Sequence, residues 1–159
     1  MKLKTILSAA AAVVLLAGCS DDPTGPSIPT LVPLPAGTPV TTTASGLQYS
    51  DITVGTGTAA GAGNRVSVHY TGWLASSGVG FDSSVGLNPY VLTIGSGGAI
   101  TGFEEGLIGM KVGGKRRLYI PAALGYGATN VYDQNGRLII PANSDLVFDV
   151  ELMGVQSSS

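Results

Sequence analysis

Cysteine, histidine and tryptophan are almost missing from this chain of 159 residues, with one of each. A lone cysteine, Cys19, leaves no disulfide framework, so the core must hold the fold unaided. His69 has no second histidine, cysteine or carboxylate at ligand spacing. The sequence therefore lacks the parts of a zinc site or a catalytic triad, and we interpret His69 as structural.

Charged residues are also scarce, at 11% of the chain, with eight basic against ten acidic side chains. Nucleic-acid binding asks for a basic patch, so no nucleic-acid partner is expected. The glycine pairs at 55–57 and 61–63 do not form the GxGxxG fingerprint, which argues against dinucleotide chemistry. We expect no cofactor and no metal.

The first eighteen residues have the pattern of a signal peptide, in which Lys2 and Lys4 precede an apolar run and small residues. The run is shorter than the roughly 20 residues that span a bilayer. With Cys19 next, it resembles a bacterial lipobox, which predicts a lipoprotein signal over 1–18 and a lipidated Cys19. The alternative is a secretory signal with an incidental cysteine. Ser20 follows the cysteine, as in lipoproteins of double-membrane bacteria that are sorted to the outer membrane. By this resemblance we expect an exported protein, lipid-anchored in the outer membrane and facing the periplasm.

Proline marks the next segment. Residues 20–44 hold six of the nine prolines and no basic residue. Such a composition favours an extended, semi-rigid spacer. We predict a lipidated tether over 19–44 and one folded domain over 45–159. Because the region before the domain is interpreted as linker, a monomer is expected.

Alternating apolar residues predict antiparallel sheet in the domain. The pattern runs over 65–70 and again over 144–153, where one face collects Leu146, Phe148, Val150 and Leu152. One short helix is predicted where Thr101 and Glu104 have the spacing of a capping box. Apolar residues at helical spacing follow, and Gly113-Gly114 ends the run.

Five motifs together carry a family resemblance: HYTG at 69–72, FDSS at 81–84, GFEEGL at 102–107, GYGA at 125–128 and LVFDVEL at 146–152. In kind and order they resemble the FKBP-type peptidyl-prolyl cis-trans isomerases, over residues 46–155. The resemblance implies an α+β fold, with a twisted antiparallel β-sheet of about five strands wrapped around one short α-helix. It also implies isomerisation of X-Pro bonds in unfolded or extended exported proteins, and competition by rapamycin-like macrolides.

The resemblance also implies a site. The proline pocket would be lined by Tyr70, Phe81, Tyr90, Ala99, Phe103, Ile139, Ile140 and Phe148. Asp82 and Tyr126 would stand at its rim, and the Tyr126 hydroxyl and the Ile100 backbone N–H would donate to substrate carbonyls. At Phe103 the family usually has a larger tryptophan, so a deeper floor is expected here.

The residues leave alternatives open. Tyr70 and Phe148 also fit plain core, because both lie on apolar faces of strands. Asp82 also fits a turn residue that caps local amides. The basic run at 115–117 is interpreted as a solvated strand face. Residues 129–138 exceed the family's usual connection, and Asn135-Gly136 predicts a hairpin beside the pocket.

An apolar pocket with one acid suits proline isomerisation, because that reaction needs no nucleophile. Its barrier of about 18–20 kcal/mol is loss of amide resonance, and a water-poor site favours the twisted amide. A second hypothesis is a non-catalytic chaperone or scaffold module. A structural envelope lipoprotein is a third, although no coiled-coil seam supports it.

Overall fold

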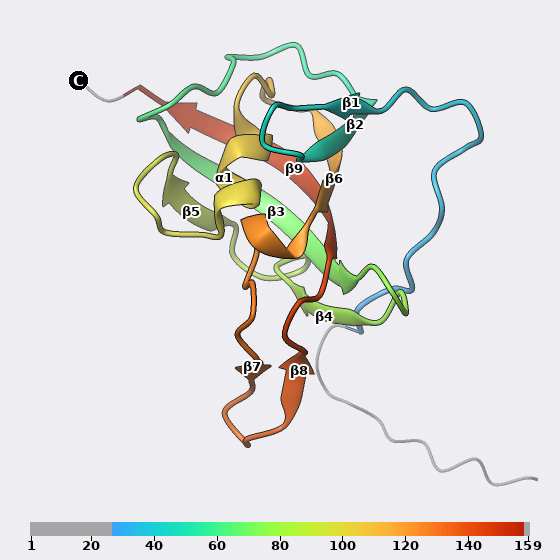
Figure 1. The fold of residues 1–159 in the computed structure, drawn as a ribbon. Coiled ribbons are helices and arrows are strands. Elements are labelled where there is room, and N and C mark those ends of the chain that lie inside the picture. Colours follow the sequence, from blue (N-terminus) through green and yellow to red (C-terminus); the bar gives the residue numbers. More distant parts are fainter. Residues whose placement is uncertain (1–26, 158–159) are drawn as a thin grey trace, which may run out of the picture.

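A seven-stranded antiparallel sheet forms the centre of the molecule (Figure 1). The computed structural model describes residues 27–157. The order of strands is β1-β2-β6-β9-β3-β4, and β5 pairs with β3 along the same edge as β4. The strands of this sheet are β1 (Thr41–Thr42), β2 (Gln48–Thr53), β3 (Arg65–Leu74), β4 (Gly80–Ser83), β5 (Tyr90–Thr93), β6 (Lys115–Ile120) and β9 (Leu146–Gln156).

The predicted α+β class is confirmed, with more strands than the five expected. The difference arises at the edges of the sheet. Two short strands, β4 and β5, pair with the same side of β3, and the two-residue β1 pairs with the outer side of β2. A separate hairpin joins β7 (Val131–Tyr132) to β8 (Leu138–Ile140). One helix, α1 (Thr101–Leu107), and a 3-10 turn, η1 (Ala122–Leu124), complete the described elements.

The core lies between α1 and the sheet, and it confirms both alternating patterns. Val66 and Val68 on β3 are at most 1% exposed. On β9 the predicted face is fully buried, at no more than 5% exposure, at Leu146, Phe148, Val150 and Leu152. Strands β3 and β9 pair over their whole lengths, so the two faces merge into one apolar layer.

The helix occupies the predicted place, but its cap and its extent differ from the prediction. Ile100 is the N-cap, and no side chain in the described part of the chain caps the helix. Glu104 turns away from the helix start and accepts backbone hydrogen bonds from the preceding loop. The helix ends at Leu107, well before Gly113, because Gly109 adopts a left-handed φ of 80°.

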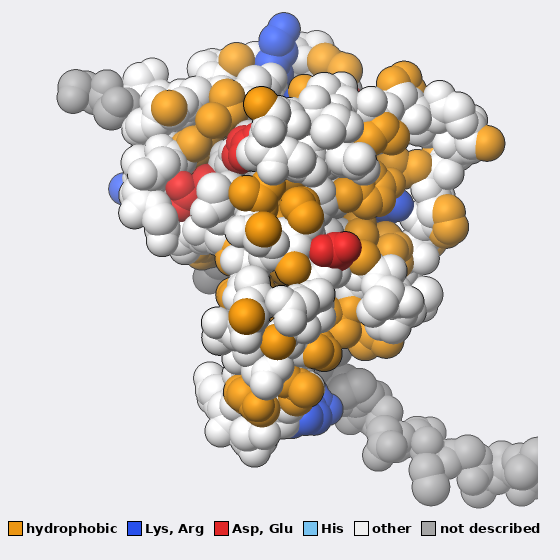
Figure 2. Space-filling view, in the orientation of Figure 1, with side chains coloured by type: hydrophobic (Ala, Val, Ile, Leu, Met, Phe, Trp, Pro, Cys, Tyr) orange, Lys and Arg blue, Asp and Glu red, His pale blue; other side chains and the backbone are white. Residues whose placement is uncertain are grey.

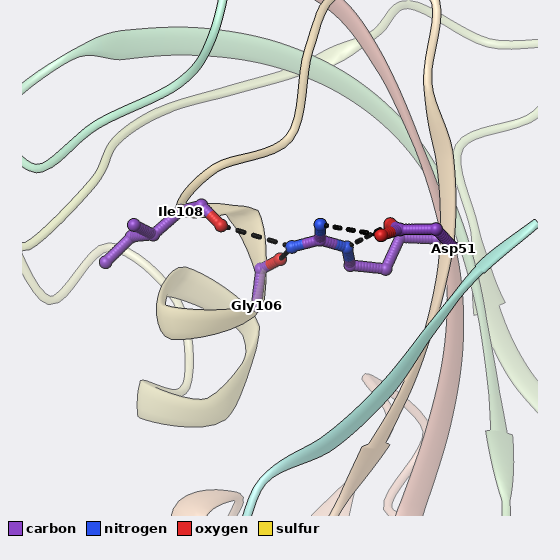
Figure 3. A network of polar contacts seen from close by, with 4 residues as sticks. Asp51, Gly106 and Ile108 are labelled. Carbon is purple, nitrogen blue, oxygen red and sulfur yellow. Dashed lines mark hydrogen bonds and ion pairs between the residues drawn. The ribbon is translucent and has the colours of Figure 1, made fainter. Parts of the chain in front are cut away.

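The basic run at 115–117 was expected on a solvated face, and this expectation is wrong for two of its three residues. Arg116 is 6% and Arg117 is 5% exposed. Arg116 donates to the carbonyls of Gly106 and Ile108 at 3.0 and 3.1 Å, and pairs with Asp51 at 2.6 Å (Figure 3). A cation at the open carbonyls of a helix end is favourable. Arg116 therefore ties the end of α1 to β2 and β6.

Composition predicted a semi-rigid spacer for the Pro-rich segment, but its described part, residues 27–44, contacts the domain. In Figure 1 this segment, in blue, rises from beside β4 along one side of the molecule and leads into β1. The indole N–H of Trp73 donates to the Pro29 carbonyl at 2.7 Å, and Arg117 donates to the Val32 carbonyl at 2.6 Å. The predicted signal peptide and Cys19 lie outside the described residues. Within those residues, no helix is long and apolar enough to cross a membrane.

Candidate active site

A cavity of about 200 Å³ opens beside the start of α1, between the helix and the strands β3, β4 and β9. Most of its wall is aromatic or aliphatic. It is lined by Tyr70, Phe81, Asp82, Tyr90, Gly98, Ala99, Ile100, Phe103, Tyr126 and Phe148. The structure thus gathers nine of the eleven residues predicted for the site, from six separate stretches of chain.

The wall is an aromatic cluster in edge-to-face contact. The Phe103 and Phe148 ring centroids are 5.3 Å apart with planes at 77°, and Phe81 meets Phe148 at 5.5 Å and 84°. Tyr70 lies 5.7 Å from Phe103 and 5.9 Å from Tyr90. Each such pair contributes about 0.5–1.5 kcal/mol beyond its buried area. The rings support one another, so the wall is stiff.

Phe103 and Phe148 belong to both the core and the cavity. They are 3% and 5% exposed and join the main apolar cluster, yet both also line the cavity. Tyr70 is half-buried and packs against that cluster. The two alternative interpretations of Tyr70 and Phe148, core or pocket, are therefore compatible.

A glycine makes the close packing of this wall feasible. Gly72 on β3 lies beneath Phe81 and Phe148, and a Cβ at this position would stand 2.7 Å from a ring atom of each. Real Cβ atoms do not approach so closely, and both rings are locked by neighbours. The glycine of the HYTG motif therefore serves the aromatic wall.

The rim carries three tyrosine hydroxyls and one carboxylate. Tyr70 donates to Asp82 Oδ2 at 2.6 Å, and Tyr90 donates to the Gly98 carbonyl at 2.7 Å. Tyr126 is 39% exposed at the mouth. Asp82 makes no bond to a local amide among the described residues; Ser83 Oγ accepts from the Val85 N–H instead. The turn-cap alternative for Asp82 thus has no support in the hydrogen bonds.

The rim environment keeps Tyr70 and Tyr126 protonated. Burial raises the pKa of Tyr70 well above its usual range, and the hydrogen bond to Asp82 raises it further. Burial and the Asp82 charge also raise the pKa of Tyr126. Both hydroxyls therefore remain neutral hydrogen-bond donors through the ordinary pH range.

Glu104 shapes the mouth of the cavity, a role that sequence reasoning missed. Although only 6% exposed, its carboxylate accepts from the backbone N–H groups of Gly95 at 2.7 Å, Gly97 at 3.4 Å and Ala99 at 3.0 Å. Burial alone would raise the pKa of Glu104, but these donors hold it below its usual value. The loop that ends in Ala99 and Ile100 is thereby fixed to α1.

Two predicted lining residues are not brought to the cavity. Ile140 is 2% exposed inside the apolar core, and Ile139 packs against the same cluster from the hairpin side. The β7–β8 hairpin turns at Asp133–Arg137, where Gly136 has a φ of 77°, as its Asn-Gly dipeptide predicted. Gly98 lines the cavity and was missed, because a glycine carries no chemical signal in the sequence.

The family model of the FKBP-type peptidyl-prolyl cis-trans isomerases matches residues 56–153. That span covers the sheet from β3 to β9 and every lining residue of the cavity. The chain belongs to this isomerase family. It is therefore an enzyme of the peptidyl-prolyl cis-trans isomerase class, as the motifs predicted.

Individual relatives of the isomerase agree with this assignment. An FK506-binding protein of Neisseria meningitidis is 45% identical over 111 residues, which are 69% of this chain and 96% of that protein. The chloroplastic isomerase FKBP16-3 of Arabidopsis thaliana is 46% identical over 116 residues, or 72% of this chain, but the match spans only 51% of the relative. The crystal structure of FkpA from Escherichia coli is similar at a TM-score of 0.63 and 38% identity, over 76% of this chain and 53% of that one.

Proposed function

We propose that this isomerase accelerates X-Pro rotation by holding the proline ring in the aromatic cavity, without proton transfer or a covalent step. The observation that carries the proposal is the cavity itself, an apolar wall with hydroxyl donors and one carboxylate confined to its rim. A pyrrolidine ring fits such a wall, and the few polar groups fix its orientation.

Rate enhancement follows from the difference between the planar and twisted amide. A planar X-Pro amide has more charge separation than the twisted one, so leaving water for an apolar cavity costs the ground state more. Phe103, Phe148 and Phe81 supply that water-poor wall. Tyr126 and the Ile100 N–H donate to the carbonyls on either side of the proline, which holds the peptide while the bond turns.

Asp82 is proposed as a rim electrostatic group. Its carboxylate lies over the mouth and is oriented by Tyr70 at 2.6 Å. In this role it takes no proton from the substrate. Its charge contributes to the electrostatic field at the rotating amide, and it orients the Tyr70 hydroxyl.

The proposed substrates are extended or unfolded polypeptides that contain proline, and macrolides such as rapamycin or FK506 are proposed competitors. The macrolide proposal is supported by the Neisseria relative, which is called an FK506-binding protein. A further proposal is that Cys19 is lipidated and anchors a monomer in the outer membrane, facing the periplasm. The basic, apolar and small-residue order of residues 1–19 supports it.

A first experiment measures cis-to-trans exchange of a Leu-Pro peptide with the chain from Ser20 onward, which holds all the described residues. Catalysed exchange that rapamycin abolishes is the expected result. Exchange without inhibition would support catalysis but reject macrolide binding. The cause would then be Phe103, which is smaller than the tryptophan usual in the family. No exchange from the folded chain would reject catalysis in favour of a binding module.

A separate test addresses the anchor. Full-length chain and a Cys19→Ser variant would be expressed in a double-membrane bacterium with labelled palmitate. We expect label and membrane association in the first and neither in the second. Secretion of unlabelled, soluble protein by both would support an ordinary signal peptide.

A further inference from the structure

The N-terminal strap, defined as residues 27–34, docks on the strand that carries one wall of the cavity. Figure 1 shows it descending in blue to β4. The Ile28 side chain packs directly on Gly80, the first residue of β4, where a Cβ would collide with it. The next two residues, Phe81 and Asp82, line the cavity.

The second anchoring point lies on β3. Trp73 is 4% exposed, and its indole N–H donates to the Pro29 carbonyl at 2.7 Å. Trp73 is also the residue that pairs with Gly80 across the two strands. The strap therefore contacts both members of one cross-strand pair, immediately beside the pocket residues.

Strand β4 needs such support. It has four residues, it stands at the end of the sheet, and its register with β3 shifts between Gly72 and Trp73. Short edge strands with a bulge are weakly held and open easily. The strap supports β4 at this irregular pair, where the ladder itself contributes least.

The strap lies outside the span that the family model matches, which begins at residue 56. A third contact fastens the strap's far end, where Arg117 donates to the Val32 carbonyl at 2.6 Å. Arg117 is itself held by Asp149 at 2.6 and 2.7 Å. The strap is thus attached to the domain at three points, on Gly80, Trp73 and Arg117.

We infer that the strap is a positioning segment that holds the Phe81–Asp82 wall in its binding geometry, so that releasing it weakens substrate binding. The inference rests on the proposed function for its kinetic consequence. Preorganised walls bind more tightly because less ordering is needed on binding. Release therefore raises KM more than it lowers kcat.

The test compares the chain from Ser20 with Ile28→Ser, which removes the packing on Gly80, and Trp73→Phe, which keeps a ring but loses the donor. Val40→Ala is the control, since Val40 is 54% exposed and lies just beyond the strap, in the stretch that leads to β1. We expect KM and the rapamycin Kd to rise about fivefold in the first two variants, with kcat within about twofold of wild type. The control should match wild type.

Amide hydrogen exchange supplies a readout independent of activity. Phe81 and Asp82 should exchange about tenfold faster in Ile28→Ser than in wild type or Val40→Ala, while core amides on β9 stay protected. Lower thermal stability with unchanged KM, Kd and β4 exchange would overturn the inference and leave the strap a purely stabilising element. An inactive wild type would instead count against the proposed function, and β4 exchange would still decide the strap.

Discussion

The Tyr70 hydroxyl donates a hydrogen bond to Asp82 Oδ2 at 2.6 Å, across the pair of strands β3 and β4. This bond joins the two rim groups whose sequence interpretation left alternatives open. It orients the carboxylate over the cavity and occupies the hydroxyl.

Removing the donor should loosen Asp82 without disturbing the wall. In Tyr70→Phe the ring keeps its contacts with Phe103 and Tyr90, and only the bond to a charged acceptor is lost. We expect kcat/KM to fall about threefold to tenfold, with little change in melting temperature. Asp82→Leu should give a similar or larger loss. Unchanged efficiency and stability in Asp82→Leu would remove Asp82 from the mechanism.

The reaction should depend little on pH. No group in the proposed mechanism gains or loses a proton, and the raised pKa values of Tyr70 and Tyr126 keep both donors protonated. We expect a flat kcat/KM between about pH 6 and about pH 9. Exchange rates measured with one peptide across that range provide the check. A bell-shaped profile would indicate general acid-base catalysis instead.

Adding a methyl group at Gly72 should break the aromatic wall. In Gly72→Ala the new Cβ meets Phe81 and Phe148 at 2.7 Å. Overpacking of this kind costs about 1–3 kcal/mol of unfolding free energy, and the displaced rings should also abolish most activity. Gly61→Ala is the control, because its Cβ would have its nearest neighbour at 3.5 Å. Equal stability of the two variants in urea titrations would contradict the packing argument.

Glu104 should stabilise the fold only where it is ionised. Its pKa is lowered on folding from the usual 4.5, so its contribution is fully present above that value and is lost as pH falls through the folded pKa. Glu104→Gln should cost about 1–3 kcal/mol at neutral pH, because an amide offers one acceptor to several backbone donors.

The measurement is the unfolding free energy of both proteins from neutral to strongly acidic pH. The gap between wild type and Glu104→Gln should narrow as the carboxylate is protonated. A constant gap would show that the donors do not discriminate between carboxylate and amide. Glu105→Gln is the control, because among residues 27–157 the Glu105 carboxylate accepts a side-chain hydrogen bond from Ser45 alone.

The hairpin offers a contact for longer peptides. Tyr132 and Leu138 are 55% and 45% exposed on it, and Figure 2 shows hydrophobic side chains gathered on this projection. Replacing residues 130–138 by a shorter turn should change the order of preference across a panel of long peptides and leave tetrapeptide rates unchanged. Identical rates across the panel would refute a role in substrate binding.

Sequence patterns alone predicted the two long strands and the position of the helix. Alternation over 65–70 and 144–153 needs no tertiary information, because a half-buried strand must alternate. The motifs then brought Phe81, Asp82 and Tyr126 together through family resemblance.

Only the tertiary structure decided the remaining features. The sequence suggested Ile139 and Ile140 as pocket residues, yet in the structure both pack with the apolar core. Arg116 and Arg117 look solvated in the sequence, yet each buried guanidinium bonds a carboxylate and at least one backbone carbonyl. The spacing of Glu104 suggested a helix cap, but its carboxylate accepts hydrogen bonds from the backbone of the preceding loop.

The strap shows the same limit most clearly. Composition predicted that residues 27–44 could not bury enough apolar surface to fold by themselves. An extended segment need not fold by itself to dock, because Trp73, Gly80 and Arg117 of the sheet provide a surface for it to contact. The sequence determines which segments can form elements, whereas a partner's surface decides where an extended segment comes to lie.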